Sequence, residues 1–151
     1  MTVNKTYYHG TTKNFTEFKP VKGNTSRRVN NEIESNKSFW FSNTKHAVEF
    51  FANGGVRTPK GVLYPDAKII EVNLIMNNPL IIDMANAFSF AISMIFEDKQ
   101  IYDIALIKEQ KIKFAKNNDY DSVIFKNAYD FSPFGNEVVA VFKPEQIIIV
   151  N

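Results

Sequence analysis

The pattern of hydrophobic and polar positions predicts two short strands and a helix in the first third of the chain. Thr6 to His9 and Ser38 to Ser42 (SFWFS) are short runs rich in aromatic residues, which is typical of strands. Asn43 or Thr44 then offers a helix N-cap, and Gly54-Gly55 predicts where that helix ends. Between them, apolar residues at helical spacing predict one buried helix face: Ala47, Val48, Phe50 and Phe51.

The remainder of the chain reads as runs of strands separated by helices. Strands are predicted at 61–64, 68–76, 80–82, 122–125, 137–142 and 146–150, and helices over 84–97 and 101–116. This order favours an α+β fold over alternating βαβ units. The long polar segment 19–37 is typical either of a functional loop or of disorder, and both interpretations stay open.

Composition narrows the class without naming a function. The 151 residues suit one domain, and a net charge of +2 is too small to indicate nucleic-acid binding. Cysteine is absent, which excludes disulfides and thiolate metal sites. No signal peptide and no membrane span of about 18 apolar residues can be read, so we expect a cytoplasmic protein without membrane contact.

His9 is one of only two histidines and stands where the first predicted strand ends. A histidine in such a place is often a hydrogen-bonded structural residue. A neutral imidazole can also hold a ligand hydroxyl, because one ring nitrogen donates and the other accepts. Gly10, the next residue, would let a ligand approach the main chain closely.

Two further segments carry candidate chemistry. In SFWFS, alternation puts Phe39 and Phe41 on one face and Trp40 on the other, so Trp40 either packs in a core or stacks on a flat ligand. Glu137 heads the apolar strand Val138 to Phe142. It is either a solvated charge at a strand end or a carboxylate that accepts a sugar hydroxyl and stabilises a developing cation.

The order of these pieces resembles the ADP-ribosyltransferase superfamily, in the His-Tyr-Glu branch that includes diphtheria-toxin-like and poly(ADP-ribose) polymerase catalytic domains. The resemblance is strongest to small bacterial and phage-associated domains, including those of polyvalent phage proteins. Those domains also tend to carry an Asn-Pro-Leu turn, as at 78–80, and a Tyr-Asp-x-Val-Ile strand, as at 120–124. The similarity spans about residues 7–150 and implies a single domain, 1–151, with a split β-sandwich of two antiparallel-rich sheets and peripheral helices.

The resemblance implies a mono-ADP-ribosyltransferase that takes NAD+ as co-substrate and needs no metal. Glu137 and His9 would be catalytic. The NAD+ contacts that it implies are His9, Gly10, Thr11, Trp40, Phe41, Ser42 and Phe50. The aromatic loop 128–135 would select the acceptor through Tyr129, Phe131 and Phe134, or these residues would simply pack the loop; Arg27 and Arg28 would either contact the pyrophosphate or be solvated.

The implied acceptor is a macromolecule, with protein favoured over nucleic acid, and the implied context is a phage-associated or toxin-type effector that an inhibitory partner could silence. Trp40 and Phe50 stand where the family has tyrosines, so the ring is kept and the phenol hydroxyl is lost. Gly135 replaces the first carboxylate of a Glu-x-Glu pair, which argues against the Arg-Ser-Glu branch. Two alternatives stay open: a degenerate NAD+-binding or protein-interaction module, and an RNA 2′-phosphotransferase or rifamycin-modifying enzyme of related fold.

Overall fold

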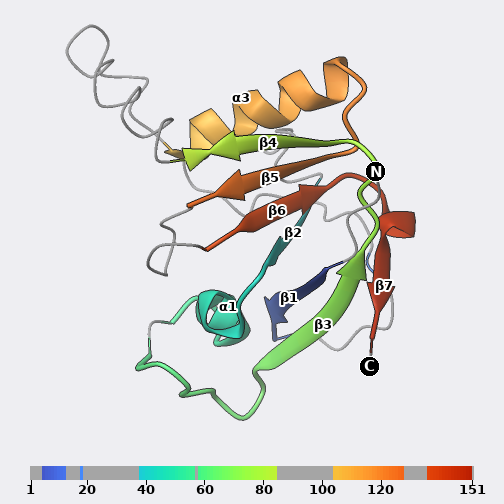
Figure 1. Ribbon diagram of the computed structural model, residues 1–151. Coiled ribbons are helices and arrows are strands. Elements are labelled where there is room, and N and C mark those ends of the chain that lie inside the picture. The colour runs from blue at the N-terminus through green and yellow to red at the C-terminus, as the bar shows by residue number, and fades with distance from the viewer. Residues whose placement is uncertain are drawn as a thin grey trace, which may run out of the picture.

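The computed structural model describes residues 5–12, 18, 38–56, 58–84, 104–127 and 136–150. Within these ranges the chain is a mixed α+β protein with one seven-stranded sheet and two α-helices (Figure 1). The strands are β1 (Thr6–Thr11), β2 (Phe39–Ser42), β3 (Lys68–Leu74), β4 (Pro79–Asp83), β5 (Ser122–Lys126), β6 (Val138–Val141) and β7 (Ile147–Ile149). The helices are α1 (Lys45–Ala52), α3 (Ile104–Asn117) and the short 3-10 turn η3 (Pro144–Gln146).

The sheet has the strand order β4-β5-β6-β2-β1-β3-β7, and every described pair except β4–β5 is antiparallel. Its two halves meet at a narrow seam. In the described residues β1 and β2 share the register pair Tyr8↔Ser42, whereas β1 and β3 pair from Thr6↔Asn73 to Thr11↔Lys68. Figure 1 shows β4, β5 and β6 together on the side of the sheet next to α3, and β1, β3 and β7 together on the other side, with β2 between them.

Alternation along the strands divides the buried side chains into two clusters. The first joins both halves of the sheet and includes Tyr7, Phe18, Phe39, Phe41, Val72, Leu74, Met76, Ile124, Val139 and Val141. The second lies where α3 packs and contains Met84, Ile112, Ala115, Val123, Phe125 and Ala140. Residues of β2, β5 and β6 contribute alternately to the two clusters, so both faces of the central strands are covered.

The helix α1 lies directly on β1 because Gly10 has no side chain. An added Cβ at Gly10 would overlap the Val48 carbonyl oxygen and would lie 2.8 Å from the Ala52 nitrogen. Thr44 is the N-cap of α1, since its hydroxyl accepts the Ala47 N–H at 3.3 Å. Asn53 is the C-cap.

Most predicted elements are present, with small differences in their ends. The strand expected at 61–64 is wrong: this segment is a turn followed by irregular backbone, and Gly61 has a φ of 84°. The buried face of α1 also differs from the prediction, because Phe50 is half-buried and Phe51 is 52% exposed, while Glu49 is buried. The helix expected over 84–97 lies, except for Met84, outside the described residues, as does the polar segment 19–37.

Candidate active site

His9, Tyr7 and Glu137 share one face of the sheet. His9 and Tyr7 are two residues apart on β1, so their side chains point to the same side. The Tyr7 hydroxyl donates to Glu137 Oε1 at 3.3 Å, which places the Glu137 carboxylate on that side too. Since successive same-face residues are about 7 Å apart along a strand, His9 is the next same-face neighbour of the residue that Glu137 contacts.

The His9 ring is held by a residue of the neighbouring strand β2 and by two aromatic rings. Its Nδ1–H donates to the Trp40 carbonyl oxygen at 2.8 Å. Phe18 lies edge-on at 5.1 Å between ring centroids, and Phe41 lies at 5.6 Å. Burial lowers the pKa of His9 and outweighs the opposing effect of the Trp40 hydrogen bond, so the ring is neutral near pH 7. A neutral imidazole that carries its proton on Nδ1 has its lone pair on Nε2, which can accept a hydroxyl hydrogen.

Glu137 is anchored through its main chain and remains partly accessible at its carboxylate. The Glu137 N–H donates to Asn43 Oδ1 at 2.9 Å, and the Asn43 N–H donates to the Glu137 carbonyl at 3.2 Å. The carboxylate Oε2 is 3.9 Å from the ammonium of Lys5, and the Glu137 side chain is 18% exposed. The backbone of Glu137 is therefore fixed at the head of β6 while its carboxylate faces both Tyr7 and solvent.

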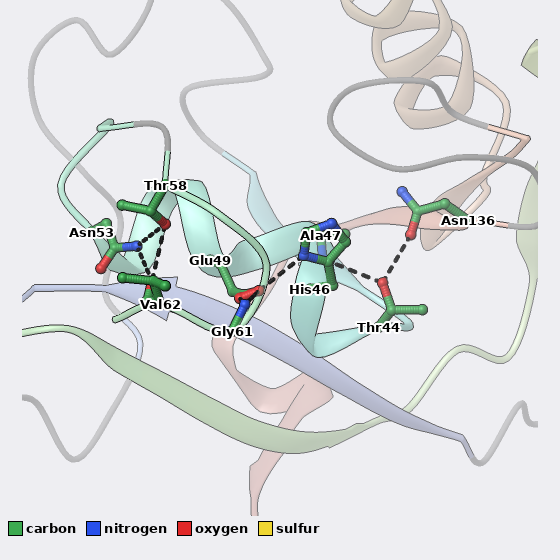
Figure 2. Close-up of polar contacts among 9 residues, drawn as sticks. All are labelled: Thr44, His46, Ala47, Glu49, Asn53, Thr58, Gly61, Val62 and Asn136. Carbon is green, nitrogen blue, oxygen red and sulfur yellow. Dashed lines mark hydrogen bonds and ion pairs between the residues drawn. The ribbon is translucent and has the colours of Figure 1, made fainter. Parts of the chain in front are cut away.

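Asn136, the residue before Glu137, connects β6 to the start of α1. Its side chain is 2% exposed. The Ser42 hydroxyl donates to Asn136 Oδ1 at 2.8 Å, and the Thr44 hydroxyl, shown with Asn136 in Figure 2, is 3.4 Å from the same oxygen. Ser42, which the family resemblance implied as an NAD+ contact, is thus buried and hydrogen-bonded to Asn136. The sequence analysis did not single out Asn136.

A second polar network ties α1 to the segment that follows it (Figure 2). Both carboxylate oxygens of Glu49 accept the Gly61 N–H at 2.9 Å, and Glu49 Oε1 lies 2.8 Å from His46 Nδ1. Burial acts to raise the pKa of Glu49, but the contacts with His46 and Gly61 and the charge of Lys60 lower it below its usual range. Asn53 donates to Thr58 and Val62. The segment 58–64 is therefore held by the side chain of Glu49 in α1 and by the side chain of Asn53 at its C-cap.

Trp40 lies on the opposite face of the sheet from His9 and Glu137. Its indole is stacked on Phe125 with ring centroids 5.9 Å apart and an angle of 20° between the rings. Trp40 packs against the second cluster, whereas its neighbour Phe41 belongs to the first. Lys108 Nζ lies 5.9 Å from the centroid of the Trp40 ring. The structure therefore places the main chain of Trp40 against His9 but keeps its indole away from His9 and Glu137.

The other predicted site residues lie around these groups or outside the described residues. Gly10 faces α1, and Thr11 is half-buried at the end of β1. Phe50 is half-buried and packs edge-on against Phe51, with ring centroids 5.2 Å apart. The proposed acceptor residues Tyr129, Phe131 and Phe134, together with Arg27 and Arg28, lie outside the described residues.

Sequence reasoning missed three residues of this region: Tyr7, Phe18 and Asn136. Tyr7 stands in the same strand as His9, and its period of two with His9 was the available signal. Phe18 and Asn136 gave no such signal. In the described part of the chain no group of three His, Asp or Glu side chains gathers as metal ligands do. None of the described helices has the length and apolar character needed to cross a membrane.

Comparison with known proteins assigns a family to nearly the whole chain. A family model described as ADP-ribosyltransferase in polyvalent proteins matches residues 4–150. Curated proteins and solved structures give no match. The matched range includes β1 with His9, the β2–α1 segment, and Glu137 at the head of β6.

Proposed function

Since the chain belongs to the family of ADP-ribosyltransferases in polyvalent proteins, we propose that it cleaves NAD+ between nicotinamide and ribose and transfers one ADP-ribose to an acceptor. The observation that supports this proposal is the position of Glu137. Its carboxylate lies on the sheet face that carries His9, and the buried hydroxyl of Tyr7 lies against it. A fixed carboxylate on the same sheet face as a neutral imidazole suits a sugar with neighbouring hydroxyls.

In the proposed reaction the bond between ribose C1′ and the nicotinamide nitrogen breaks, and the bonding electrons leave with nicotinamide. Nicotinamide is cationic in NAD+, so it departs neutral and needs no proton. Glu137 accepts the hydrogen of the ribose 2′-hydroxyl and stabilises the positive charge that develops at C1′. His9 accepts a ribose hydroxyl through Nε2. An acceptor nucleophile then forms the new bond to C1′ and loses its proton, with Glu137 near enough to assist.

The remaining NAD+ contacts are proposals carried over from the family resemblance. Gly10 would bind the carboxamide through its main chain, and Thr11 would lie near the adenosine end. Trp40 and Phe50 would provide ring contacts to nicotinamide, with Phe41 and Ser42 lining the pocket. In the structure the Trp40 ring is stacked on Phe125. We further propose a protein acceptor and a phage-associated effector role in a bacterial cytoplasm.

The seam between β1 and β2 supports a split sandwich as the finer description of the fold. The single described register pair Tyr8↔Ser42 lets the strands diverge toward His9. There the His9 imidazole contacts the Trp40 carbonyl. We propose that the NAD+ cleft opens along this divergence, with β1 as one wall and the head of β6 as the other.

The proposal is tested by release of nicotinamide from labelled NAD+ in the presence of a bacterial lysate as a source of acceptors. Glu137→Gln keeps the shape of the side chain and removes its charge. We expect a fall of about 10²- to 10³-fold in the rate of release, the range for loss of one transition-state-stabilising group. Glu145→Gln is the matched control, because Glu145 is exposed on η3, away from the head of β6.

Three outcomes separate the alternatives. Activity that Glu137→Gln removes and Glu145→Gln keeps supports the enzyme. NAD+ binding by the wild type without release of nicotinamide, with or without lysate, would instead favour a degenerate binding module. No binding of NAD+ would leave only an interaction role for the fold.

A further inference from the structure

We propose that Tyr7 is a positioning residue for Glu137: its hydroxyl occupies carboxylate Oε1 and thereby directs Oε2 to the ribose hydroxyl. This inference rests on the proposed function. The family resemblance gives Tyr7 no role, and the sequence alone shows only an aromatic residue in an ordinary strand. The geometry assigns the role because the hydroxyl of a buried ring reaches a carboxylate 130 positions away along the chain.

Tyr7 is rigidly held. Its side chain is 0% exposed and lies in the first cluster, with Phe39, Phe41 and Val72 among the members. β1 is paired with β3 along its whole length, so the backbone under the ring is fixed as well. A tyrosine has few rotatable bonds, and close packing of the ring fixes where the hydroxyl lies. The hydroxyl therefore stands at a defined point in front of β6.

The hydroxyl acts as a donor throughout the pH range of an enzyme assay. Burial raises the pKa of Tyr7 far above its ordinary value, and the negative charge of Glu137 and the hydrogen bond to it raise it further. A phenol that keeps its proton can donate to a carboxylate, and such a charge-assisted hydrogen bond is stronger than one between neutral groups. Tyr7 is therefore a permanent donor that orients Glu137 through Oε1.

The two oxygens of Glu137 have different surroundings. Oε1 receives the hydrogen bond of Tyr7. Oε2 lies 3.9 Å from Lys5, whose side chain is 61% exposed, so that ion pair is weak and easily displaced. The main chain of Glu137 is held on both sides by Asn43. With the backbone fixed and Oε1 engaged, Oε2 is the oxygen that a substrate hydroxyl would meet.

The experiment compares wild type, Tyr7→Phe and Tyr8→Phe. Tyr7→Phe deletes only the hydroxyl, and Tyr8→Phe is the matched control because Tyr8 points to the opposite face of the same strand. We expect Tyr7→Phe to lower kcat for nicotinamide release about 10-fold, as loss of one charge-assisted hydrogen bond would, with KM for NAD+ changed less than about 2-fold.

A second measurement follows the Glu137 carboxyl carbon by NMR at pH 7, with Glu137→Gln used to assign the signal. Tyr7→Phe should move this signal, because Oε1 loses its hydrogen bond, whereas Tyr8→Phe should leave it in place. A purely structural role for Tyr7 would change thermal stability and leave both the carboxyl signal and kcat in place.

The failures can be told apart. A wild type that releases no nicotinamide contradicts the proposed function, and the positioning role falls with it. If wild type is active and Glu137→Gln is inactive, yet Tyr7→Phe keeps the wild-type carboxyl signal and kcat, then only the role of Tyr7 is overturned.

Discussion

Replacing Gly10 with alanine is expected to destabilise the fold by forcing α1 away from β1. The added Cβ would overlap the Val48 carbonyl oxygen and would lie 2.8 Å from the Ala52 nitrogen. Both atoms belong to the helix backbone, so no side chain can rotate to make room. Overpacking of this kind costs about 1–3 kcal/mol, and two backbone contacts place Gly10→Ala near the upper end.

The expected loss is partly offset in the unfolded state. Alanine restricts the unfolded chain more than glycine does, which returns about 0.4–1 kcal/mol where the native backbone accepts it. A net loss of about 2 kcal/mol corresponds to a fall in Tm of about 4–8 °C for a chain of this size. Thermal unfolding followed by circular dichroism measures it, with urea unfolding as a check that the transition stays two-state.

Gly61→Ala is the comparison that isolates the steric effect. Gly61 has a φ of 84°, but nothing lies within 4 Å of an added Cβ there. Its cost is therefore only that of the left-handed backbone, about 1–2 kcal/mol before the unfolded-state gain. The reasoning is refuted if Gly10→Ala unfolds like the wild type. A Gly10→Ala variant of normal Tm that has lost NAD+ binding would show instead that the space beside Gly10 serves a ligand.

Two further variants test the networks around β2 and α1. Glu49→Gln should lower the free energy of unfolding by about 1 kcal/mol at pH 7. Because the pKa of Glu49 is depressed in the folded state, the difference in stability between this variant and the wild type should shrink as the pH falls below 4.5. A difference between their urea midpoints that stays constant with pH would contradict this prediction. Trp40→Ala should cost about 2–3 kcal/mol by removing the ring stacked on Phe125, whereas Trp40→Phe should keep most of the stability; equal Tm values for the two variants would show that this stack is unimportant.

The sequence predicted those elements whose causes are local. β1 and β2 follow from short aromatic runs, and α1 follows from an N-cap and a pair of glycines, so their positions agree with the structure to within a few residues. The strand prediction at 61–64 was wrong although Val62, Leu63 and Tyr64 form an apolar run. Each is more than 40% exposed, and the segment is held by Asn53 and Glu49 instead of by strand pairing.

The candidate site was predictable only where a single residue carried its own signal. His9 and Glu137 stand at strand ends next to recognisable segments, and the structure places both on one sheet face. Their supporting groups are long-range: Tyr7 meets Glu137 across 130 positions and Ser42 meets Asn136 across 94. No periodicity encodes such pairs, because the order of β6, β2 and β1 in the sheet determines them.

The residues Tyr7 to Gly10 place functional side chains on one face of β1 and a glycine on the other. The order of these residues along the strand is therefore important. Tyr7 and His9 point to the face of Glu137, whereas Gly10 lies under α1, where a side chain cannot fit. Because side chains alternate strictly along a strand, slipping β1 by one residue would exchange these faces. A slip that brought His9 under α1 would put Tyr8 where His9 now lies and Thr6 in front of Glu137. The packing of α1 on Gly10 therefore fixes the register that keeps Tyr7 and His9 on the face of Glu137, so the stability of the helix contact and the geometry of the proposed site depend on the same residue.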